Sequence, residues 1–253
     1  MINYTNESIA EETTTNTLDW LKTLNKEGLD MSPIVYFFDE QDVPLLMVHL
    51  PSQDDDQQTK MLTHFLTTPF LSLLPIQAVS VCQDVWFTKA NADNENAPQT
   101  MQEVMDDENY VRPSESINKE QGLITIVIDK AKAGIWNMLE YGRDDKGNIY
   151  TKDQNRTVVE NWDENNMDSW IVPMMTSGFA RDITELMDFS REEELMALLQ
   201  AFSSLSEMQF RIGMRPDMAD VITKHYESIM DDDKSEMLKR LLLDGEDNNG
   251  KLQ

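Results

Sequence analysis

The chain has 253 residues, of which 47 are Asp or Glu and 21 are Lys or Arg, giving a net charge of -26. This length suits one large domain or two small ones, and the apolar content of 40% is too high for a disordered chain. A single cysteine excludes an intramolecular disulfide framework and a cysteine-rich zinc site. Because no run of 18 apolar residues and no signal-peptide pattern is present, we expect a cytoplasmic protein without a membrane anchor.

The first part of the chain predicts a helix followed by a β-hairpin. Residues 1–16 are polar and rich in Thr and Asn, which predicts a flexible N-terminal arm. Leucines at helical spacing over residues 18–24 predict a helix, and Gly28 suits its C-terminal end. The apolar runs 34–38 and 43–50, separated by a polar turn, predict two antiparallel strands.

A second helix and a third strand are predicted next, followed by an acidic interruption. Residues 61–66 have an apolar face at helical spacing, and this helix should end before Pro69. Residues 77–87 form an apolar run typical of a strand. Residues 88–121 hold eight acids, three bases and few large apolar side chains, so we expect either a mobile loop or a functional one.

The next part of the chain predicts several more antiparallel strands. Residues 123–128 form the strongest strand pattern, and residues 135–141 return from it after a turn. Turn-forming residues at 144–148 precede another strand at 149–151, and residues 169–175 contain a proline that favours an edge strand. This order predicts an α+β fold, with an antiparallel sheet flanked by helices and followed by a helical C-terminal region.

The C-terminal third predicts helices. We expect an α+β domain over residues 17–177, a helical region over 178–245 and a polar tail over 246–253. Ser190 and Glu193 have the spacing of a capping box at the start of a helix.

The distribution of charge argues against nucleic acid and anionic membranes as direct partners. Residues 1–128 carry 21 acids and 6 bases, and residues 157–253 carry 21 acids and 9 bases. Only residues 129–156, with 5 acids and 6 bases, are not strongly acidic. Nucleic acid and anionic lipid bind through Lys and Arg, so we expect neither to bind directly.

The acidity could instead imitate DNA. The average charge density is about fourfold lower than that of duplex DNA, so a mimic needs its carboxylates gathered on one face. Three acidic clusters could supply that face: Asp54, Asp55 and Asp56; Asp106, Asp107 and Glu108; and Asp231, Asp232 and Asp233. The alternative is that these clusters are solvated loops and helix ends.

No pattern in the sequence predicts catalysis, a cofactor or a metal ion. The chain has no phosphate-binding glycine loop, no nucleophile elbow and no zinc-protease motif. Its histidines, His49, His64 and His225, do not share a metal-binding spacing. Cys82 lies in a predicted buried strand, where cysteine is usually a small apolar residue. We therefore expect a protein that is not an enzyme.

The chain contains 17 methionines, of which ten lie between Met167 and Met237. Methionine fills irregular cores, but its flexible side chain also suits adaptable contact surfaces. The second interpretation predicts a helical surface that docks a protein partner or another copy of the chain. Its contact candidates are apolar residues of the helical region: Met196, Leu199, Phe202, Met218, Ile222 and Met230.

Residues 79–129 contain three short elements in a characteristic order. Asp84-Val85-Trp86 ends one strand, Arg112-Pro113-Ser114-Glu115 follows a loop, and Gly122–Asp129 forms the next strand. In this order they resemble a family of uncharacterised phage and bacterial proteins. The family often has an Arg before the second strand, where this chain has Asn118-Lys119-Glu120. The resemblance implies a viral origin and no activity.

These features together favour a non-enzymatic, acidic protein–protein interaction factor encoded by a phage. Such a factor would inhibit or adapt a host or viral protein with a basic surface, in the cytoplasm of the host cell. One alternative is a DNA-mimic inhibitor of a nucleic-acid-binding protein. Another is a structural or assembly protein of a virus particle, for which self-association into a homo-oligomer is expected.

Overall fold

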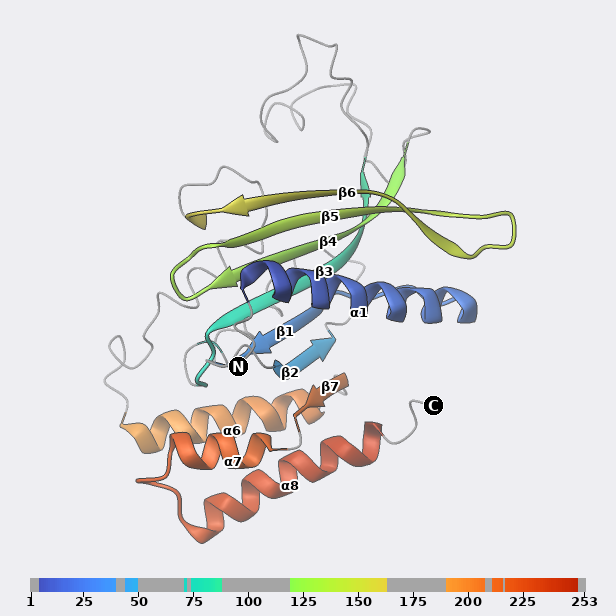
Figure 1. Ribbon diagram of the computed structural model, residues 1–253. Helices are drawn as coiled ribbons and strands as arrows, with labels where there is room; N and C mark the ends of the chain where they lie inside the picture. Colours follow the sequence, from blue (N-terminus) through green and yellow to red (C-terminus); the bar gives the residue numbers. More distant parts are fainter. Residues whose placement is uncertain are drawn as a thin grey trace, which may run out of the picture.

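A computed structural model describes most of the chain and has an α+β fold (Figure 1). The described residues are 5–39, 44–49, 71, 74–87, 119–162, 190–207, 211–215 and 217–249. The predicted helix at 61–66, the predicted strand at 169–175, most of the acidic interruption and the boundary near residue 178 lie outside them. Within the described part of the chain, no helix has the length and apolar character needed to cross a membrane.

Seven strands form one sheet in the order β6-β5-β4-β3-β1-β2-β7. Each strand is antiparallel to its neighbours. The strands are β1 (Ile34–Phe38), β2 (Pro44–His49), β3 (Ala78–Phe87), β4 (Glu120–Asp129), β5 (Gly134–Arg143), β6 (Ile149–Val159) and β7 (Arg211–Met214). Strand β6 lies at one edge of the sheet and β7 at the other.

Figure 1 shows the N-terminal helix lying across the sheet and the C-terminal helices next to strands β2 and β7. Strand β1 is covered on both faces, since all five of its residues are buried. Ile34, Tyr36 and Phe38 pack in the cluster under α1 (Asn6–Glu27), whereas Val35 and Phe37 pack in the cluster on the opposite face. That second cluster also contains residues of α6 (Arg191–Glu207), α7 (Met218–His225) and α8 (Asp232–Asn249). The C-terminal helices therefore share a core with the sheet.

Helix α1 begins at Asn6, so residues 6–16 are helical where the sequence predicts part of a flexible arm over residues 1–16. Three of its threonines, Thr13, Thr14 and Thr17, face the sheet, where they are buried and hydrogen-bonded. Thr13 lies 2.9 Å from the Ser80 hydroxyl, and Thr14 lies 2.7 Å from the Thr125 hydroxyl. Threonine lowers helix propensity, but these contacts satisfy its hydroxyl groups in the core.

The structure confirms the predicted hairpin and the long central strands, with three differences. Strand β6 continues to Val159, far beyond the predicted 149–151, because it pairs along nearly the whole of β5. Strand β7 was not predicted from the sequence and pairs with β2. Helix α8 continues to Asn249, so residues 246–249 are helical where a polar tail was predicted.

Candidate functional site

Three of the six predicted contact residues lie in the core. Leu199, Met218 and Ile222 are at most 1% exposed and belong to the cluster between the C-terminal helices and the sheet. Their helical spacing reflects packing against the strands, because an amphipathic helix turns its apolar stripe toward the core. These three residues are not accessible to a partner in this fold.

The other three candidates differ in exposure. Met196, on the outer side of α6, is 43% exposed. Met230 is partly buried and packs against the core cluster. The side chain of Phe202 lies outside the described part. Met237, in α8, was not among the candidates, yet it is 38% exposed.

The beginnings of α6 and α8 lie next to each other, and both helices carry acidic side chains in their first turn. The amino group of Lys234 joins them, at 2.9 Å from both Glu192 and Asp231. We call this surface the acidic end and define it by five exposed carboxylates: Glu192, Glu193, Asp231, Asp232 and Asp233. Of the three acidic clusters predicted from the sequence, only Asp231–Asp233 lies in the described residues.

Hydrogen bonds favour the ionised form of two of these carboxylates. The predicted capping box is present, because the Glu193 carboxylate accepts hydrogen bonds of 2.8 Å from both the backbone N–H and the hydroxyl of Ser190. These bonds lower the pKa of Glu193, and hydrogen bonds from Lys234 lower the pKa of Asp231. Acidic side chains in a first helical turn also interact favourably with the helix dipole.

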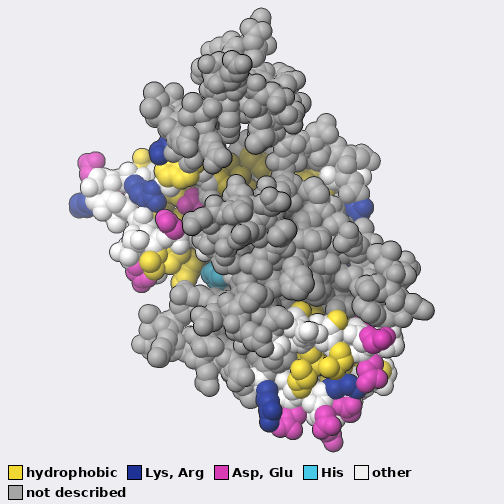
Figure 2. All heavy atoms as spheres, turned by 180° about the vertical axis from the view of Figure 1, so that it is seen from behind, with side chains coloured by type: hydrophobic (Ala, Val, Ile, Leu, Met, Phe, Trp, Pro, Cys, Tyr) yellow, Lys and Arg dark blue, Asp and Glu magenta, His cyan; other side chains and the backbone are white. Residues whose placement is uncertain are grey.

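Figure 2 shows the acidic end from behind, at the lower right of the view. Asp and Glu side chains border hydrophobic side chains there, with Lys or Arg side chains among them. Met196 lies one turn after Glu192 in α6, and Met237 lies one turn after Lys234 in α8. Exposed apolar side chains thus accompany the carboxylates on both helices.

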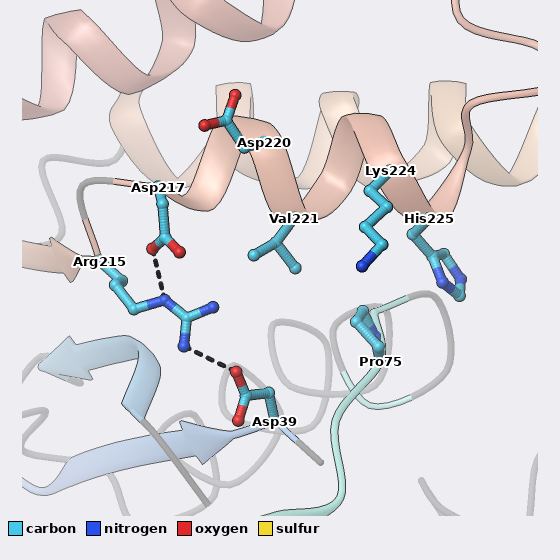
Figure 3. Close-up of a pocket in the computed structure, with 8 residues that line it drawn as sticks. All are labelled: Asp39, Pro75, Arg215, Asp217, Asp220, Val221, Lys224 and His225. Carbon is cyan, nitrogen blue, oxygen red and sulfur yellow. Dashed lines mark hydrogen bonds and ion pairs between the residues drawn. The ribbon is translucent and has the colours of Figure 1, made fainter. Parts of the chain in front are cut away.

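A charged pocket of about 550 Å³ lies between α7 and the end of β1 (Figure 3). Its lining residues are Asp39, Pro75, Arg215, Asp217, Asp220, Val221, Lys224 and His225. Figure 3 shows Lys224 and His225 directed from α7 toward Pro75, while Arg215 lies between two carboxylates.

Arg215 connects the sheet to the helical layer at this pocket. Its guanidinium donates to Asp39 at 2.7 Å and also to Asp217. Burial lowers the pKa of Arg215, but its hydrogen bonds to Asp39 and Asp217 outweigh burial and raise that pKa. The two ion pairs tie the start of α7 to the end of β1. Because both carboxylates already neutralise the guanidinium, Arg215 offers little to an anionic ligand.

No local sequence pattern indicates this ion pair, since Asp39 and Arg215 are 176 positions apart. The acid-rich helix starts were visible in the sequence, but their proximity was not. Cys82 is fully buried, as predicted, and burial raises the pKa of its thiol. Among the described residues, no group of His, Cys, Asp or Glu could hold a metal ion. Comparisons with protein-family models, curated proteins and solved structures find no match to this chain.

Proposed function

We propose that the protein is a non-enzymatic interaction factor that binds a basic segment of a protein partner at the acidic end. The observation that carries this proposal is the pairing of exposed methionines with gathered carboxylates on α6 and α8. Met196 is 43% exposed and Met237 is 38% exposed, each one turn from the acidic end.

Helix capping explains the presence of only some carboxylates of the acidic end. Glu193 caps α6, and Lys234 neutralises part of the charge of Glu192 and Asp231. Asp232 and Asp233 are also exposed. A local excess of negative charge steers a basic partner and fixes its orientation, while burial of flexible methionines supplies most of the affinity.

The test is affinity capture from lysate of the native cell, with the full chain immobilised. We expect the unmodified chain to recover one basic protein in stoichiometric amount. The double variant Met196→Lys/Met237→Lys should lose that protein, because two lysines remove the apolar contact and oppose a basic partner. Leu29→Lys is the matched control, since Leu29 is 54% exposed and follows α1 on the other face of the sheet. All variants must first show the thermal unfolding midpoint of the unmodified chain.

Equal recovery by the double variant would overturn the proposed surface. A partner that is lost in 0.5 M salt and displaced by duplex DNA would instead support a DNA mimic, because phosphate-like contacts are strongly salt-dependent. Recovery of only viral structural proteins would support an assembly role. The viral origin implied by the resemblance stays a prediction.

A further inference from the structure

Strand β6 is an edge strand exposed along almost its entire length. It spans Ile149–Val159 at the end of the sheet order, and every residue from Tyr150 to Val158 is exposed. In the described residues no strand pairs with its outer side. An edge strand presents backbone N–H and C=O groups that can pair with a further strand.

The β5–β6 hairpin is also the place where a second acidic chain can approach. Residues 134–159 contain four acids and four bases, so the hairpin is neutral within a chain of net charge -26. A basic partner gains no attraction from a neutral hairpin, whereas a second copy of this acidic chain can approach it without net repulsion.

Symmetry restricts how two copies of β6 can pair. An antiparallel pair related by a two-fold axis places one residue opposite the same residue of the other copy. The regular part of β6 begins after the irregularity that follows Thr151. An axis at Asp153 or Arg156 would oppose two identical charges, and an axis at Gln154 would set Lys152 opposite Arg156. Like charges directly opposite each other destabilise a sheet.

An axis at Asn155 avoids these repulsions in the middle of the strand. It sets Asp153 opposite Thr157 and Gln154 opposite Arg156, and the two asparagines face each other. Each of these pairs can form a side-chain hydrogen bond.

We propose that the protein forms a homodimer in which two β6 strands pair antiparallel about an axis at Asn155, joining two seven-stranded sheets. This proposal is independent of the proposed function, because the acidic end lies in the helical layer. Helix α8 of that layer contacts β7, at the opposite edge of the sheet from β6 (Figure 1).

Cysteine cross-linking tests the register. Directly opposite residues have Cα atoms about 4.5–5.5 Å apart, within the range of a disulfide. Asn155→Cys should therefore form a disulfide-linked dimer under mild oxidation. Asp153→Cys is the matched control on the same face of β6, because its symmetry mate would lie about 13 Å away along the strand. The native thiol of Cys82 is 0% exposed and adds no background.

Sedimentation of the full chain supplies the second measurement. The unmodified chain should dimerise reversibly, and Thr157→Asp should weaken dimerisation about tenfold, because symmetry creates two Asp–Asp oppositions. Adding Asp153→Lys to that variant should restore the dimer. A monomeric unmodified chain at about 100 µM would overturn the proposal. Equal cross-linking of Asn155→Cys and Asp153→Cys would overturn the register and with it the proposed interface.

Discussion

Truncation of Met218 tests whether the C-terminal helices share a hydrophobic core with the sheet. This residue opens α7, is 1% exposed and belongs to the same cluster as Val35 and Phe37 of β1. Burial of a methionine side chain contributes about 1.5–3 kcal/mol, and the cavity left by truncation adds to that loss. We therefore expect Met218→Ala to lower the free energy of unfolding by about 3 kcal/mol.

Met196→Ala makes the same chemical change at a residue that is 43% exposed. We expect it to change the free energy of unfolding by no more than about 0.5 kcal/mol. Urea unfolding followed by the fluorescence of the five tryptophans measures both variants by linear extrapolation. Equal effects of the two substitutions would refute the packing of α7 on the sheet and return Met218 to the set of contact candidates.

Three further predictions concern the sheet. Gly134→Ala should destabilise the protein by about 3 kcal/mol or more in urea unfolding, because a Cβ there would lie 1.8 Å from the Val127 carbonyl oxygen. An unchanged unfolding midpoint would contradict that close approach. Thr14→Val should lower the free energy of unfolding by about 1–3 kcal/mol in the same assay, since the buried hydroxyl of Thr125, 2.7 Å away, loses a hydrogen-bond partner. An unchanged free energy of unfolding would argue against this hydrogen bond between α1 and the sheet. Burial raises the pKa of Asp84, so the folded protein keeps a proton that the unfolded chain releases, and the contribution of Asp84 to stability should fall as pH rises above the ordinary pKa of about 4. Asp84→Asn should remove this part of the pH dependence, which unfolding curves between pH 4 and pH 7 would show; the same slope in both proteins would contradict the assignment.

The sheet was largely predictable because its strands carry strong local patterns. The runs that became β1 and β4 are dense in apolar residues, and the turns after them contain turn-forming side chains. The first half of α1 was not predictable. Thr13 and Thr14 bond backbone carbonyls of their own helix, but in the core they also meet the hydroxyls of Ser80 and Thr125, which lie 67 and 111 positions further along the chain. No local pattern indicates such distant hydrogen-bond partners.

The candidate site was less predictable for a related reason. An apolar stripe on a helix has the same spacing whether it meets a partner or the protein's own sheet, so Met218 and Ile222 were indistinguishable from contact residues. The exposure of Met196 depends on which side of α6 faces outward, and the packing of the buried leucines of α6 determines that side. Likewise the acidic end depends on the packing of α6 against α8, which brings Lys234 to 2.9 Å from Glu192.

The two proposed surfaces differ in charge, and each charge suits a different partner. The β6 edge is neutral and polar, so it can meet an identical strand without repulsion. The acidic end is anionic and bears exposed methionines, so it repels a second copy and suits a basic partner. Dimerisation through β6 would leave both acidic ends accessible, because they lie in the helical layer and α8 packs near the opposite edge of the sheet. A dimer of this kind would bind a partner with two basic segments more tightly than a monomer, since the second contact becomes intramolecular. Thr157→Asp should therefore weaken binding to a bivalent partner and leave binding to a single basic segment unchanged.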